Sequence, residues 1–149
     1  MIIGIHLLVG AAIAQKLSNP ILGFSFAFIS HYFLDFLPHS QYDVKFIYQK
    51  IWHKSFFDFL KIILDISLAV LLIFIFSEKI FWALGGAFFT ILPDFFSFLF
   101  LIFPKNGFLK KHYYFHVNKV NLHLNKKTPA FLGILIQLLI GFVAVLFLK

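Results

Sequence analysis

Five long runs of apolar residues make up most of this 149-residue chain, and prolines, lysines and short polar segments separate them. A helix needs about 20 mostly apolar residues, with a range of roughly 17–25, to cross the hydrocarbon core of a bilayer. The runs cover residues 2–15, 21–37, 55–77, 80–103 and 129–148. They predict an all-α fold, a polytopic membrane helix bundle of about five transmembrane helices, with residues 1–149 as a single integral membrane domain.

The composition supports a membrane protein and limits its chemistry. Only 13% of the residues are charged, against about 25% in soluble domains. Cysteine is absent, which excludes disulfides and thiolate metal ligands. All thirteen basic residues are lysine, and the lack of arginine argues against a nucleic-acid partner, because guanidinium groups favour bidentate recognition of phosphate and guanine. The net charge of +7 instead indicates membrane lipids with anionic head groups as partners.

The distribution of lysines predicts an orientation. Two connections are rich in lysine, which stands at residues 45, 50 and 54 in one and at residues 105, 110, 111, 119, 126 and 127 in the other. With five spans, both connections lie on one face, and lysine-rich loops are typically cytoplasmic. We therefore expect a bacterial-type inner (plasma) membrane protein with a cytoplasmic N-terminus, an external C-terminus and a cytoplasmic basic loop at residues 105–128.

Histidines and aspartates gather toward the same predicted face. His6 stands near the start of the first run, His31 and Asp35 near the end of the second, and His39 directly after Pro38. Ionisable residues inside a membrane are costly and tend to mark function. The pattern predicts one polar site beneath the cytoplasmic head groups.

His31 and Asp35 are the first candidate metal ligands. Their i, i+4 spacing places an imidazole and a carboxylate on one helix face. Nitrogen and oxygen ligands suit Zn²⁺, and also Mn²⁺ or Fe²⁺. The alternative is a hydrogen-bonded pair within a helix bundle that holds no metal.

Further candidates lie in the second half of the chain. Asp94 follows Pro93 inside an apolar run, where a kink beside a buried carboxylate would form a wall of the site; the alternative is an aspartate that caps a restarted helix. His112 and His116, also i, i+4, could close the site from the basic loop, or could lie on an interfacial helix. His53 and His123 are expected at the interface.

Some of these residues resemble known families. The run from Ser30 to His39, with its H-x-x-x-D element followed by Pro and His, resembles the zinc-dependent phospholipase C and P1 nuclease group. The early His6 and the Leu92-Pro93-Asp94 run resemble the bacterial membrane-bound metal-dependent hydrolase family. The resemblance implies a divalent metal, zinc first, held by His31 and Asp35 with further ligands at His6, His39 and Asp94. Here Phe95-Phe96-Ser97 follows, where those families often carry a second acidic residue.

The sequence thus leads to a functional hypothesis with alternatives. We expect a membrane-embedded metal-dependent hydrolase that acts at the cytoplasmic leaflet on a phosphate ester, with a lipid-linked ester as the expected substrate class. Asp43 or His116 is the expected general base. The alternatives are a non-enzymatic membrane protein, such as a small transporter or channel subunit or an assembly factor that binds ions through the His/Asp cluster, and an inactive relative with a structural metal.

Overall fold

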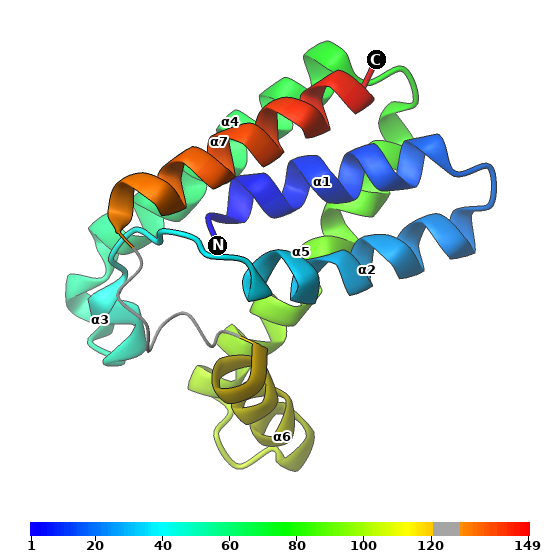
Figure 1. Ribbon diagram of the computed structural model, residues 1–149. Helices are drawn as coiled ribbons and strands as arrows, with labels where there is room; N and C mark the ends of the chain where they lie inside the picture. Colours follow the sequence, from blue (N-terminus) through cyan, green and yellow to red (C-terminus); the bar gives the residue numbers. More distant parts are fainter. Residues whose placement is uncertain (121–128) are drawn as a thin grey trace.

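The computed structural model describes residues 1–120 and 129–149, and these residues form helices without any strand. The predicted all-α class is confirmed. The long helices are α1 (Ile3–Lys16), α2 (Pro20–Phe36), α4 (Phe56–Phe76), α5 (Ile80–Ile102) and α7 (Ala130–Phe147). The short ones are α3 (Lys45–Tyr48), the 3₁₀ turn η1 (Trp52–Lys54), α6 (Gly107–Phe115) and the π-helical turn η2 (His116–Val120). Figure 1 shows the long helices gathered around α1.

Local signals set the ends of the helices. Asn19 precedes α2, where its side chain accepts hydrogen bonds from the backbone N–H groups of Ile21 and Leu22 and Pro20 takes the first helical position. Leu37 is extended (ψ 150°) ahead of Pro38, as expected for a residue before proline. The five long helices begin and end within one residue of the predicted runs.

Three helices, α4, α5 and α7, are long and apolar enough to span a membrane, which is consistent with a membrane protein. The other two apolar helices are shorter, with 14 residues in α1 and 17 in α2. At 1.5 Å per residue, α1 is about 21 Å long. It packs against α2, α4, α5 and α7, so α1 forms the centre of the bundle.

Small residues allow α1 and α5 to pack with their backbones in contact. A Cβ atom on Gly86 would overlap the carbonyl oxygen of Gly10, and a Cβ atom on Gly10 would overlap the Thr90 side chain. Thr90 also donates a hydrogen bond from Oγ1 to the carbonyl oxygen of Ala27 on α2, over 3.1 Å. Close packing through small residues drives helix association in lipid, where the hydrophobic effect contributes little.

Large apolar side chains cover the outside of the bundle. Phe81, Phe131 and Ile21 are 86%, 77% and 74% exposed. Water-soluble monomers rarely present contiguous apolar surface on this scale. Acyl chains of a bilayer are the solvent that suits this surface.

The segment predicted as a basic loop, residues 105–128, contains two helical elements. Asn106 accepts a hydrogen bond from the Leu109 N–H and begins α6, which continues into η2. The helix has only nine residues, which is too short for its periodicity to be read in a polar segment. Of the two alternatives for His112, the one that expects a helix in this segment agrees with α6.

Candidate metal centre

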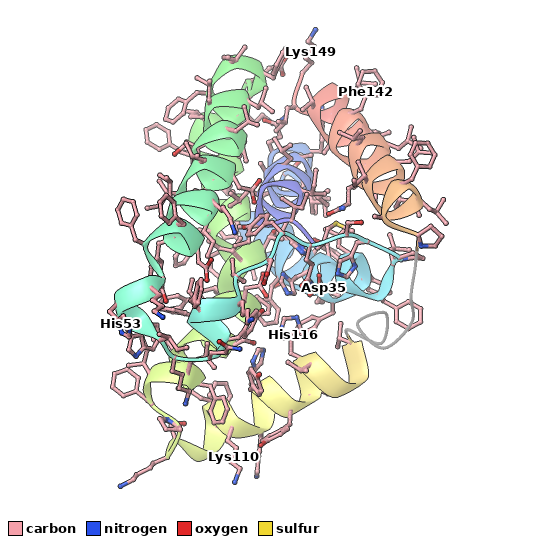
Figure 2. The ribbon with its side chains drawn as sticks, turned by 90° about the vertical axis from the view of Figure 1, so that its left-hand side faces the viewer. Asp35, His53, Lys110, His116, Phe142 and Lys149 are labelled. Atoms are coloured by element: carbon pink, nitrogen blue, oxygen red, sulfur yellow. The ribbon has the colours of Figure 1, made fainter. Side chains whose placement is uncertain are left out.

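The candidate site lies at the end of the bundle where α1 begins and α2 ends. His6 comes from the first turns of α1, His31 and Asp35 from the last turns of α2, and His116 from the start of η2. All four side chains are buried, with at most 2% of the residue exposed. Figure 2 shows Asp35 and His116 in neighbouring positions, although 81 residues separate them in the chain.

Four residues, which we call the metal-binding group, could hold a metal ion: His31, Asp35, Asp94 and His116 each offer one ligand atom, and these atoms all lie within 4.8 Å of one another. The His31 Nε2 atom is 3.1 Å from His116 Nε2, 3.3 Å from Asp35 Oδ2 and 3.8 Å from Asp94 Oδ1. The His116 Nε2 atom is 2.8 Å from Asp35 Oδ2. Ligands bonded to a tetrahedral ion at 2.0–2.2 Å lie about 3.4 Å from one another, and the four observed distances bracket that separation.

An outer hydrogen bond orients the His116 ring. Ser97 Oγ donates to the Pro93 carbonyl oxygen over 3.0 Å and lies 3.0 Å from His116 Nδ1, so the ring donates its Nδ1–H to this hydroxyl. His116 Nε2 then lies 2.8 Å from Asp35 Oδ2, a contact that a proton on Nε2 or a metal ion between the two atoms would satisfy. A histidine whose second nitrogen is held in this way is typical of metal sites.

His6 binds the other oxygen of the same carboxylate. Its Nε2 atom lies 3.2 Å from Asp35 Oδ1, and its ring stacks on the His31 ring with centroids 4.3 Å apart. The Met1 amino group also donates to Asp35 Oδ1, over 2.7 Å. Asp35 therefore faces His31 and His116 with one oxygen, and His6 and Met1 with the other. His6 lies next to the four-residue group and not within it.

His112 adds a contact between α6 and α2. The Tyr32 hydroxyl lies 3.2 Å from His112 Nε2. Burial, together with the nearby His116 and His31 rings, lowers the pKa of His112 to about 4, so this imidazole is neutral at pH 7. His112 thus lies beside the four-residue group without contributing to it.

Two predicted site residues lie apart from the group. His39 follows the turn at Pro38, where its Nδ1 approaches the Leu37 carbonyl oxygen (2.7 Å) and its Nε2 approaches Gln41 Nε2 (3.1 Å). Asp43 is exposed, and its backbone carbonyl accepts a hydrogen bond from Lys61. Because α2 ends at Phe36, neither residue continues the helical face that carries His31 and Asp35.

The remaining histidines and aspartates have other positions. His53 lies in the exposed turn η1, and His123 lies outside the described residues. Asp58 accepts hydrogen bonds from the N–H groups of Phe46 and Ile47 at the start of α3. Asp94, expected as a buried carboxylate, has 34% of its side chain exposed, and α5 continues as a helix through Pro93.

Sequence reasoning missed Ser97 and Tyr42. Ser97 stands three residues after Asp94, on the same face of α5, and this i, i+3 spacing was the available signal. Tyr42 donates from its hydroxyl to Asp65 Oδ2 over 3.3 Å, and Asp65 Oδ2 also accepts from the N–H of Gly4 at the start of α1. Burial and the Asp65 carboxylate raise the pKa of Tyr42, so its hydroxyl remains a donor.

A cavity of about 470 Å³ opens beside the metal-binding group. Asp35, Asp94 and His116 are among the residues that line it. The lining also includes Gln41, Tyr42, Tyr48 and Tyr113. A small molecule in this cavity would lie against both the carboxylates and the tyrosines, and the partly exposed Asp94 faces it.

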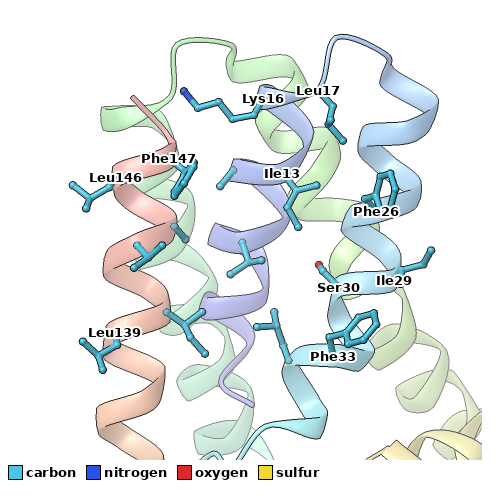
Figure 3. Close-up of a pocket in the computed structure, with 16 residues that line it drawn as sticks. Ile13, Lys16, Leu17, Phe26, Ile29, Ser30, Phe33, Leu139, Leu146 and Phe147 are labelled. Atoms are coloured by element: carbon cyan, nitrogen blue, oxygen red, sulfur yellow. The ribbon is translucent and has the colours of Figure 1, made fainter.

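A larger groove lies between α2 and α7 with α1 as its floor (Figure 3). It has a volume of about 1280 Å³ and an almost wholly apolar lining. Lys16 and Ser30 are the polar residues of the groove. Phe33 and Leu34, which directly precede Asp35 in α2, also line it. The groove offers a surface for an apolar chain and has no catalytic groups.

No protein-family model, curated protein or solved structure matches this chain.

Proposed function

We propose that this protein is a membrane-embedded metal-dependent hydrolase, with a lipid-linked phosphate ester as its substrate and zinc as its metal. The convergence of His31, Asp35, Asp94 and His116 beside a cavity carries the proposal. Because of the lysine-rich connections, we place this end of the bundle at the cytoplasmic leaflet of a bacterial-type inner membrane. The resemblance of short patches to metal-dependent hydrolases agrees with this function and stays a prediction.

His31, Asp35 and His116 would hold the ion through two imidazoles and a carboxylate, with Asp94 either completing the ligand set or leaving that position to water. When bound, the metal would supply Lewis-acid activation of water near neutral pH and offset charge on phosphate oxygens. Ser97 holds the His116 ring through Nδ1, which would leave Nε2 to bind the ion. His6 holds the second oxygen of Asp35 and thereby fixes the rotation of that carboxylate.

Asp94 is the residue best placed to act on a substrate in the cavity. It lines the cavity and is the most exposed member of the metal-binding group. Its carboxylate can accept a proton from attacking water or bind the ion directly, and both roles require the negative charge. His116 Nε2 is engaged with Asp35, which makes His116 better suited to a ligand role than to that of the general base.

The apolar groove supports a lipid-linked substrate. An acyl chain lying between α2 and α7 would reach Phe33 and Leu34, immediately before Asp35 in α2. A polar head carried by that chain would then lie at the level of the metal-binding group. The tyrosine hydroxyls of the cavity could donate hydrogen bonds to its phosphate oxygens.

A transport path has less support. The centre of the bundle, between the metal-binding group and the opposite end, is an apolar cluster that includes Leu7, Ala11, Ala83 and Ile73. At that opposite end, the buried polar contact among the described residues joins Gln15 with Ser77 and the Phe147 carbonyl oxygen. Neutral groups of this kind hold helices together and do not carry protons or metal ions across a membrane.

The substitution Asp94→Asn tests the proposed chemistry. We expect it to lower kcat/KM for a lipid phosphate by at least about 100-fold, because the amide has the size of the carboxylate but cannot accept a proton. Phosphate release by the detergent-purified, zinc-loaded protein measures this. Glu78→Gln, at the opposite end of the bundle, is the charge-matched control. Full activity in Asp94→Asn would remove the role of Asp94, and loss of activity in Asp43→Asn alone would transfer the general-base role to Asp43.

The substitution Ser30→Trp tests the groove. An indole at this position would displace part of an acyl chain, and the loss of two buried methylene groups at about 0.8 kcal/mol each corresponds to about a 15-fold lower kcat/KM. A short-chain, water-soluble phosphate ester should be hydrolysed at the wild-type rate. Phe74→Trp, on the lipid-facing side of α4 with Phe74 60% exposed, is the control. Equal losses on both substrates would argue against a chain in the groove.

A further inference from the structure

Helix α6 lies across the end of the bundle that holds the metal-binding group. Figure 2 shows it running crosswise to α4, with Lys110 pointing away from the bundle. One side of α6 faces α5: Leu109 is buried, the His112 ring lies 5.6 Å from Phe96, and the Tyr113 ring lies 4.8 Å from Phe100. A short helix that crosses the end of a membrane bundle lies at the level where lipid head groups are found.

The outer side of α6 combines lysines with aromatic rings. At 100° per residue, its exposed positions fall on one arc of the helix. We call these residues the α6 outer face: Phe108, Lys110, Lys111, Tyr114 and Phe115. The three aromatic rings are 65%, 50% and 53% exposed in chain order. Aromatic rings and lysines in alternation are typical of a surface that contacts the membrane interface.

The charge of this part of the chain is of one sign. Asp94 is the last acidic residue, and residues 95–149 contain seven lysines without any aspartate or glutamate. Ion pairs within the segment therefore cannot neutralise Lys110 and Lys111. We propose that the α6 outer face binds anionic lipid head groups of the surrounding membrane, and that this contact holds His116 in the metal-binding group.

The link to His116 follows from the chain path. α6 ends at Phe115 and η2 begins with His116, so the position of α6 sets where His116 Nε2 lies relative to Asp35. The contact between the Tyr32 hydroxyl and His112 holds α6 to α2 at the same level. The lipid contact does not depend on the proposed function. The effect of the lipid contact on metal binding does rest on the proposed function.

Fluorescence quenching in nanodiscs tests the lipid contact. The chain has no cysteine, so Gly107→Cys gives a single labelling position on the outer arc, where a Cβ atom meets nothing within 4 Å. A fluorescent dye attached at this position is quenched by lipids that carry a nitroxide spin label at the head group. We expect stronger quenching with phosphatidylglycerol present than in pure phosphatidylcholine, and loss of this difference at high salt.

Charge-neutral variants identify the residues responsible. Lys110→Gln together with Lys111→Gln should lower the equilibrium constant for the lipid contact by about 30-fold, because each lysine contributes about fivefold. Lys45→Gln with Lys50→Gln, in the other lysine-rich connection, is the matched control and should keep the phosphatidylglycerol response. Equal quenching of the wild type in both lipid mixtures overturns the proposal. So does a phosphatidylglycerol response that persists in the α6 variant. A protein partner bound to the α6 outer face in place of lipid would also overturn it.

Zinc titration of the same nanodiscs tests the coupling. We expect the α6 variant to bind zinc more weakly than the wild type when phosphatidylglycerol is present, and equally in phosphatidylcholine. Unchanged zinc affinity in phosphatidylglycerol would overturn the coupling. If the wild type binds no zinc in either mixture, the proposed function and the coupling fail while the quenching result still decides the lipid contact. If zinc binds but quenching does not respond to charge, the lipid contact and the coupling both fail while the metal-binding part of the proposed function stands.

Discussion

We expect the wild-type protein to be purified with a bound divalent metal and the Asp35→Asn variant without it. Asparagine preserves the size of the side chain but removes the charge that faces His31 and His116 at 3.3 and 2.8 Å. The same substitution weakens the contact of Oδ1 with His6. The ligand atoms lie within 4.8 Å of one another, which leaves room for a single ion, so we expect about one ion per wild-type chain, and essentially none in Asp35→Asn. The protein is purified in detergent from cells grown with zinc, manganese and iron. Elemental analysis then measures the metal content per chain and identifies the metal.

Asp58→Asn is the matched control for this measurement. Asp58 is as buried as Asp35, with 3% exposed against 2%, but it binds the backbone of α3. The variant should retain its metal and lose only a modest amount of stability. His31→Ala should behave like Asp35→Asn. A metal-free wild type, or equal metal in wild type and Asp35→Asn, would refute the metal centre and leave the alternative of a hydrogen-bonded histidine–aspartate pair.

Gly86→Ala should destabilise the whole bundle. The added Cβ would overlap the Gly10 carbonyl oxygen and the Ala14 methyl group on α1, and a backbone atom cannot move away as a side chain can. Overpacking of this kind costs about 1–3 kcal/mol. It outweighs the gain in helix propensity, which is at most about 1 kcal/mol for glycine to alanine. Thermal unfolding in detergent, followed by circular dichroism, should show a lower midpoint.

Gly85→Ala provides the comparison one residue earlier. Its Cβ would meet the ring of Phe24, the end of a side chain that can rotate. Both variants gain the same helix propensity, so their difference isolates the α1–α5 contact. Equal unfolding midpoints would show that the Gly10 and Gly86 backbones do not pack as described.

Much of the fold was predictable because a membrane simplifies the relation between sequence and structure. Backbone groups in hydrocarbon must be hydrogen-bonded within each segment, so an apolar run of sufficient length becomes a helix. Proline and asparagine mark the ends, as Asn19 and Pro20 do for α2. The central position of α1 was harder to foresee, since it depends on Gly10 and Gly86 meeting across two distant helices.

The candidate site was predictable only in part. The i, i+4 pair of His31 and Asp35 follows from helix geometry alone, and both residues lie in the metal-binding group. His39 seemed equally close in sequence, but the turn at Pro38 takes it away from the helical face. His116 was expected as a base or a loop contact, because the π-helical turn that points its Nε2 toward Asp35 has no recognisable sequence pattern.

The central place of α1 has a consequence for how the protein is made. This helix precedes every helix that packs around it, and α7, one of its partners, begins only at Ala130. The small-residue surface of α1 therefore cannot be fully covered while the chain is incomplete. Its enclosure is finished only when α7, the partner that comes last in the chain, has been made and has packed against it.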